Sequence, residues 1–400
     1  MHDEAVSEFE KSGPPALLPT PAIFHRRSVA AWVVIGTFVV FVILTLGLFF
    51  ETVSPVADFG FQPYVQADAN AYWELSGVKA GAFIPEKSDS DSGAQFAGGS
   101  WGPVYQAKLF RTDLGVLLSN FAMLALILWV VSTMKEFDLS TFTLLLLLNP
   151  LLFSITATLN KEIFSITGLI LFLRYMTAER YRLLLLTAAM LVSGGGHWQQ
   201  AAVLLMLVCL ESRFSPFRNK PLASVIFILF FFTVAYTAVF HLVPIVIAGL
   251  LAQAEAGHTI VRLDNIQGKF GFPLVVIPKI LMNVMGYFIT PSYFLLAYWS
   301  ADFSNWYDQI FMEVQEFLTT ALLFGLLIAR KLPLKQPLVY LLVVYLILTA
   351  VNPMVQPRYE YPAYVLLCLQ VARYFRLGGR ISEATQSEGS LTVHAAQSLT

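Results

Sequence analysis

The chain is poor in charge: only 13% of its 400 residues are charged, whereas 57% are hydrophobic. Soluble domains carry about one charged residue in four, so this composition argues against a soluble protein. There are only two cysteines, Cys209 and Cys368, without metal-ligand spacing, and both are expected to be packing residues.

Several sequence motifs are missing as well. There is no glycine-rich phosphate loop, zinc-ligand motif or nucleophile elbow. No segment between the apolar runs predicted to face the cytoplasm is long enough for a nucleotide-binding domain, which argues against an ATP-driven pump. No basic surface supports nucleic-acid binding.

Apolar runs near twenty residues recur along the chain, and such a run crosses a bilayer as a helix. They predict an all-α fold, a polytopic transmembrane helical bundle of about 10–12 membrane helices, with an outward-facing pocket. The expected organisation is a disordered cytoplasmic lead at 1–28, a bundle at 29–376 and a disordered cytoplasmic tail at 377–400. Within the bundle, 51–112 is the first extracytoplasmic loop and 252–308 is a second one with re-entrant or broken helices.

Most of the 25 basic residues fall in short segments on one side of the predicted helices. The first apolar run, 30–50, follows Arg26 and Arg27 and lacks a cleavage pattern, so we expect a retained first helix. The positive-inside rule then places both termini in the cytoplasm. The expected location is the inner (cytoplasmic) membrane, crossed many times.

Further helices are expected at about 113–133, 139–157, 222–251, 309–329, 336–351 and 362–375. The stretch 183–210 is ambiguous, because Gly194–His197 divides it into two apolar runs that are each too short to span. It fits either a hairpin of two short helices or one long helix, and the distribution of basic residues favours the hairpin.

Polar residues gather at the predicted outer ends of the apolar runs. The first cluster holds Asp68, Asn70, Tyr72 and Trp73. Asp68 and Tyr72 would share one face of a short helix, where the carboxylate could deprotonate an acceptor hydroxyl and the aromatic rings could stack on sugars. The alternative is an interfacial helix with a solvated acid and an aromatic belt.

The second cluster is Asn160, Lys161 and Glu162. Lysine at a helix start suits phosphate binding, since the helix amino terminus also favours anions. The alternative is a capping arrangement, with Asn160 as N-cap, Glu162 in the first turn and Lys161 extending to the surface.

The remaining candidates are His197, Arg262 and the segment from Gln356 to Tyr361. Arg358 opposes the positive-inside trend and suits bidentate phosphate recognition; the alternative is a salt bridge with Glu360 or Asp302. His197 could act as an acid, a phosphate donor or a metal ligand, although a lone histidine is more often structural. No ligand motif supports a metal, so none is assigned.

The ordered motifs resemble the integral-membrane glycosyltransferases of the GT-C fold and related multi-spanning proteins of bacterial surface-polysaccharide assembly. The resemblance rests on Asp68-x-x-x-Tyr72, Trp101-Gly-Pro-Val-Tyr105, Leu148-Asn-Pro150 with Asn160-Lys-Glu-Ile163, and Gln356-Pro-Arg-Tyr-Glu-Tyr-Pro362. The chain departs from the family pattern because Asp68 has no adjacent second acid.

The resemblance implies an inverting glycosyltransferase of the cell envelope that takes a polyprenyl-phosphate-linked sugar as donor and glycosylates a glycan, lipid or protein acceptor. The residues would then have three kinds of role. Asp68 and Glu162 would be catalytic; Lys161, Arg358, His197 and Arg262 would bind the donor phosphate; Asn70, Tyr72, Trp73, Asn160, Gln356, Tyr359, Glu360 and Tyr361 would bind substrate.

Two other functions stay open. A polymerase or ligase of lipid-pyrophosphate-linked glycans would use the same pocket, together with other polysaccharide-assembly proteins. A polysaccharide or lipid transporter or flippase would instead need charged residues at mid-membrane and, in many cases, an internal repeat, which the sequence does not show.

Overall fold

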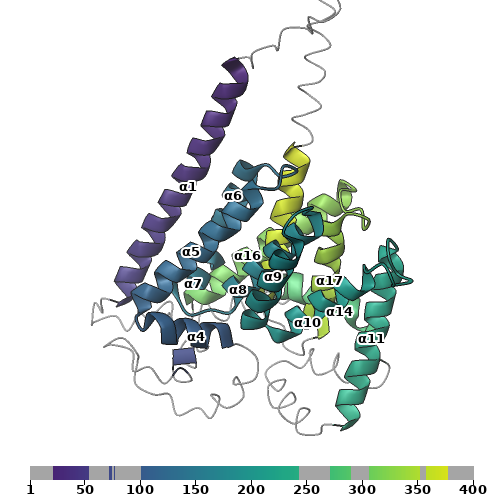
Figure 1. The fold of residues 1–400 in the computed structure, drawn as a ribbon. Coiled ribbons are helices and arrows are strands. Elements are labelled where there is room, and N and C mark those ends of the chain that lie inside the picture. Colours follow the sequence, from purple (N-terminus) through teal and green to yellow (C-terminus); the bar gives the residue numbers. More distant parts are fainter. Residues whose placement is uncertain are drawn as a thin grey trace, which may run out of the picture.

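Helices make up the computed structural model, which contains no strand in the part of the chain that it describes. It describes residues 21–53, 72–73, 76, 101–242, 271–289, 306–351 and 357–376, and side chains within most of these. The all-α prediction is therefore confirmed for these residues. Figure 1 shows the helices gathered around a helix of residues 361–376, with α1 and α11 at opposite edges.

The elements follow one another with short connections. They are α1 (Pro21–Val53), α4 (Trp101–Phe110), α5 (Asp113–Ser132), α6 (Leu139–Leu148), α7 (Leu151–Ala157), α8 (Glu162–Thr177), α9 (Arg182–Gly196), α10 (Trp198–Leu210), α11 (Pro221–Leu242), η1 (Phe272–Leu274), α14 (Val276–Ile289), α16 (Trp306–Ile328), α17 (Pro337–Val351) and η3 (Pro357–Glu360), followed by the helix of residues 361–376.

Side-chain caps define where α5 and α6 begin. The Thr112 hydroxyl accepts a hydrogen bond from the Gly115 amide at 3.0 Å, and the Asp138 carboxylate accepts one from the Thr141 amide at 2.9 Å. Each cap satisfies an amide that the first helical turn would leave without a partner. These two starts agree with the positions expected from the apolar runs.

Three expectations about helices need correction. The predicted helix at 139–157 is broken at Asn149 and Pro150, and α6 and α7 meet at a bend of 84°. Proline lacks an amide hydrogen and clashes with the preceding turn, which explains the break. The first helix begins at Pro21, inside the expected disordered lead of 1–28. Cys209 is exposed, so it is not a packing residue, whereas Cys368 is buried.

Glycines let α9 pack closely on its neighbours. A Cβ on Gly168 of α8 would lie 2.1 Å from the Ser193 hydroxyl, and one on Gly102 of α4 would lie 2.7 Å from the Gly195 carbonyl oxygen. Neither position has room for a larger side chain. The carboxyl end of α9 is therefore fixed against α8 and α4.

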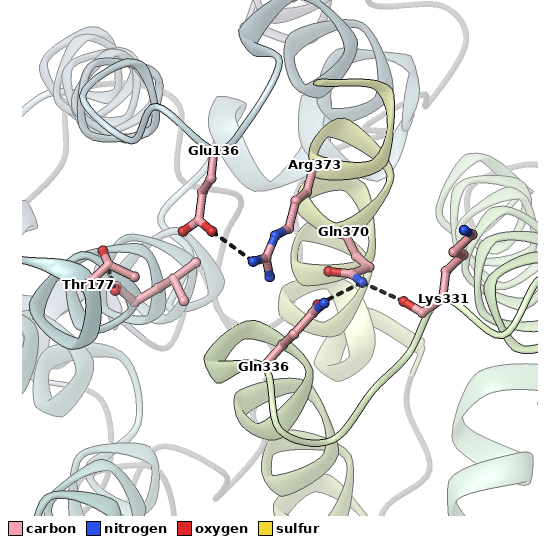
Figure 2. A network of polar contacts seen from close by, with 7 residues as sticks. Glu136, Thr177, Lys331, Gln336, Gln370 and Arg373 are labelled. Atoms are coloured by element: carbon pink, nitrogen blue, oxygen red, sulfur yellow. Dashed lines mark hydrogen bonds and ion pairs between the residues drawn. The ribbon is translucent and has the colours of Figure 1, made fainter. Parts of the chain in front are cut away.

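Polar contacts anchor one end of the helix of residues 361–376. Arg373 pairs with Glu136 at 3.3 Å, and the Gln370 amide donates to Gln336 at 3.1 Å and to the Lys331 carbonyl (Figure 2). Nearly every side chain from 360 to 370 is buried. A helix that is apolar and buried on all sides forms the centre of a core.

One helix, α5, is long and apolar enough by itself to cross a membrane, counting only residues whose side chains the structure describes. The bent pair α6 and α7 meets the same test when taken together. The other apolar helices are shorter in the part described, between 10 and 17 residues.

Candidate functional site

The candidate site is built around the start of α8. Asn160, Lys161 and Glu162 are all buried there, and the Asn160 side-chain oxygen accepts a hydrogen bond from the Glu162 amide at 2.8 Å. Asparagine commonly caps a backbone amide two residues on. The capping role expected of Asn160 is thus confirmed, although the N-cap residue itself is Lys161.

Lys161 does not extend to the surface. Its side chain is 5% exposed, and its Nζ atom lies 5.1 Å from the centre of the Tyr359 ring. A cation over an aromatic face gains electrostatic attraction, and the gain is larger away from water. The helix amino terminus adds partial positive charge at the same place. Together these features concentrate positive charge beneath Tyr359.

His197 reaches the same tyrosine from the break between α9 and α10. Its ring lies 6.0 Å from the Tyr359 ring, with the two planes nearly perpendicular. Gly196 permits this approach, because a Cβ there would lie 2.7 Å from the Lys161 carbonyl oxygen and 2.8 Å from the Ser165 hydroxyl. The glycines before His197 therefore bring it beside the start of α8.

The interpretation of 183–210 as two helices is confirmed, with the division at His197. Gln200 joins the pieces: its amide donates to the Ser165 carbonyl at 2.9 Å and to the Ser193 hydroxyl at 3.1 Å. One buried side chain thus connects α10 to both α8 and α9, which holds the break in a fixed geometry.

Tyr359 itself is held by α17. The Tyr345 hydroxyl donates to the Tyr359 carbonyl at 2.9 Å. Tyr345 also lies close enough to Glu360 and Glu162 for their charges to act on it. The sequence analysis did not single out Tyr345, because a tyrosine within an apolar helix gives no local signal that it faces a polar turn.

The first expected loop contributes to the same region. Tyr72 and Trp73 are buried in a small apolar cluster with Ala107, Val116 and Leu159. Leu159 directly precedes Asn160, so the aromatic pair lies next to the segment that leads into α8. This packing brings part of the first polar cluster of the sequence toward the second.

Glu360 and Tyr361 follow Tyr359 but enter different surroundings. Tyr361 is fully buried and stacks on Tyr364 at 5.7 Å between ring centres, which places it in the core. Burial raises the pKa of the Glu360 carboxyl to about 7, although the nearby side chains of Thr349 and Asn283 lower it. A carboxyl of this kind exchanges its proton near neutral pH.

The structure also reveals buried polar residues that sequence reasoning missed. The Asn149 amide donates to Gln315, and the Gln315 amide donates to Thr319 at 3.0 Å, which connects the bend between α6 and α7 to α16. Lys279 and Asn283 of α14 are buried as well. Their spacing of four residues in an otherwise apolar segment was the available signal.

Several sequence candidates lie outside the described residues: Asp68, Asn70, Arg262 and Gln356. Arg358 belongs to η3, but its side chain is outside the described part. Among the residues described, no group of three potential metal ligands comes together.

Comparisons with known proteins follow from this geometry as a separate finding. No family model, curated protein or solved structure matches the chain.

Proposed function

We propose that the protein is a polytopic membrane glycosyltransferase of the cell envelope, with a GT-C-like bundle and an extracytoplasmic active site. It transfers a sugar from a polyprenyl-phosphate donor to a glycan, lipid or protein acceptor. The observation that carries the proposal is the meeting of Lys161 and His197 on the ring of Tyr359, beside the buried start of α8.

The chemistry of this arrangement suits a phosphate leaving group. A sugar leaves a lipid phosphate as negative charge develops on the phosphate oxygens, and preorganised cations stabilise that charge. The Lys161 ammonium supplies one such charge away from water, where electrostatic interactions are stronger. In the proposal Arg358, His197 and Arg262 complete the phosphate site.

The acceptor side needs a base and a binding surface. We assign the base to Asp68, which would take the proton of the acceptor hydroxyl, with Glu162 as the second catalytic acid. Asn70, Tyr72, Trp73, Asn160, Gln356, Tyr359, Glu360 and Tyr361 form the proposed substrate-binding set. The packing of Tyr72 and Trp73 next to Leu159 supports the closeness of the two groups.

Exposed apolar faces support the membrane part of the proposal. Along α11 the exposed large residues Leu222, Ile226, Phe230 and Val234 recur every four positions, which places them on one helical face. Along α1 the same holds for Trp32, Ile35, Val39 and Ile43. These helices lie at opposite edges of the bundle (Figure 1), and large apolar surfaces of this kind suit contact with lipid.

The test is an analysis of lipid-linked glycans in cells that carry the wild-type gene, no gene, or the Asp68→Asn variant at matched protein level. The proposal predicts the same truncated glycan in both altered strains, and its missing unit identifies the sugar. Complete single repeat units would favour the polymerase instead. An unchanged glycan profile would contradict transfer and would favour transport.

A further inference from the structure

The turn η3 carries a second polar feature besides Tyr359. Glu360 is 1% exposed, and neither of its carboxylate oxygens has a hydrogen-bond partner in the described part of the chain. A buried ionised carboxylate without partners is costly, and such a group usually takes up a proton or a cation instead. The question is what supplies the missing positive charge or donor.

The nearest side chains provide few donors for this acid. Thr349 of α17 faces Glu360, but its hydroxyl donates its only proton to the Leu346 carbonyl at 3.0 Å. Asn283 of α14 faces Glu360 too, and its side-chain oxygen is itself buried without a partner in the described residues. A protonated carboxyl would provide the hydrogen that these acceptor oxygens lack.

Charged and titratable groups also approach from each element packed against η3. They are Lys279 on α14, Glu316 on α16 and Tyr345 on α17, and all three are buried. Within the described residues no cation pairs with Glu360, since its two oxygens have no partner. Glu316 would disfavour a second negative charge in this region.

We propose that Glu360, Asn283 and Thr349 form a buried proton-binding site in which the Glu360 carboxyl holds the proton and donates it in a hydrogen bond to a neighbouring oxygen. The proton comes from water, and its release leaves a carboxylate that the site cannot satisfy in this geometry. Release therefore favours a displaced η3.

The consequence for the candidate site follows from the position of Glu360 in the chain. It directly follows Tyr359, which contacts Lys161 and His197. A displaced η3 would draw Tyr359 away from both, so protonation would favour the assembled site. This consequence rests on the proposed function, whereas proton binding itself does not.

Infrared spectroscopy tests the proton directly, because a neutral carboxyl and a carboxylate absorb at different frequencies. The purified protein is titrated from pH 5 to 9 without Na⁺ and again with Na⁺. Three variants accompany it: Glu360→Gln, Asn283→Leu, and Glu179→Gln as a control, which removes an exposed carboxylate between α8 and α9. The readouts need no activity, so they stand whether or not sugar transfer is found.

The proposal predicts a protonated-carboxyl band that disappears as the pH rises through neutrality, regardless of Na⁺. Glu360→Gln should abolish the band, Asn283→Leu should shift it, and Glu179→Gln should leave it unchanged. If Glu360→Gln does not fold, the titration of the wild type and the shift in Asn283→Leu remain decisive. A missing band, or a band removed by Na⁺ at constant pH, would overturn the proposal; the second result would indicate a Na⁺ site.

Discussion

The Nζ atom of Lys161 lies 5.1 Å from the centre of the Tyr359 ring, although these residues come from opposite halves of the chain. The same ring lies 6.0 Å from the ring of His197. Tyr359 is therefore the point at which α8, the break between α9 and α10, and the turn η3 meet. A change at any of the three elements should affect the other two.

Gly196→Ala should separate His197 from α8. The new methyl group would lie 2.7 Å from the Lys161 carbonyl oxygen, which is part of the backbone and cannot turn aside. Overpacking of this kind costs about 1–3 kcal/mol. Gly325→Ala in α16 is the matched control, because nothing lies within 4 Å of its Cβ position, and alanine there should leave stability unchanged or raise it. Thermal unfolding in detergent compares the two, and equal shifts would contradict the close approach.

Tyr345→Phe should loosen η3. Loss of its hydrogen bond to the Tyr359 carbonyl should cost about 0.5–1.5 kcal/mol. Tyr340 on the same helix gives a control, since its buried hydroxyl has no hydrogen-bond partner in the described part. Tyr340→Phe should therefore be neutral or slightly stabilising. Denaturant titration of both variants measures the difference, and a larger loss in Tyr340→Phe would refute the assignment.

The stability of the protein should fall as the pH rises from about 4.5 to about 7 because of Glu360. Its folded-state pKa lies above the unfolded value, so the folded state binds the proton more tightly and is favoured at low pH. The difference corresponds to roughly 3 kcal/mol. Unfolding free energies of the wild type and Glu360→Gln, compared across this range, measure the contribution. A variant with an undiminished slope would show that other groups cause it.

Asn149→Leu should weaken the connection between the bend and α16. The Asn149 side chain accepts from the Leu151 amide at 3.0 Å and donates to Gln315, so leucine would leave both partners buried without this contact. A buried polar group left unsatisfied costs about 1–3 kcal/mol. The double variant Asn149→Leu with Gln315→Leu should recover part of the loss. If the two single losses add without recovery, the residues do not act as a pair.

Several helices could be predicted from the sequence, because an apolar run bounded by polar residues defines both ends. The expected helix at 113–133 agrees with α5 within one residue, and the one at 336–351 agrees equally well with α17. The bend between α6 and α7 was missed, although Pro150 stood in the sequence. What stabilises the bend is Gln315, a partner distant in the chain that no local pattern reveals.

The candidate site shows the same division between local and distant information. The capping of α8 by Asn160 depends on residues two positions apart and could be predicted. The contact of Lys161 and His197 with one tyrosine depends on how three glycines let α9 approach α8. Sequence reasoning placed these residues on one side of the membrane, but it did not identify Tyr359 as their shared contact or Tyr345 as its support.

Binding of polyprenyl phosphate to the purified protein, followed by native mass spectrometry, tests the central claim most directly. The comparison is wild type, Lys161→Met and Lys108→Met, since Lys108 also approaches a tyrosine ring but is exposed. Loss of one charge-assisted contact should weaken binding by about 1.5–3 kcal/mol in Lys161→Met, more than tenfold, and leave Lys108→Met unchanged. Equal binding by all three proteins would contradict a phosphate site at the start of α8.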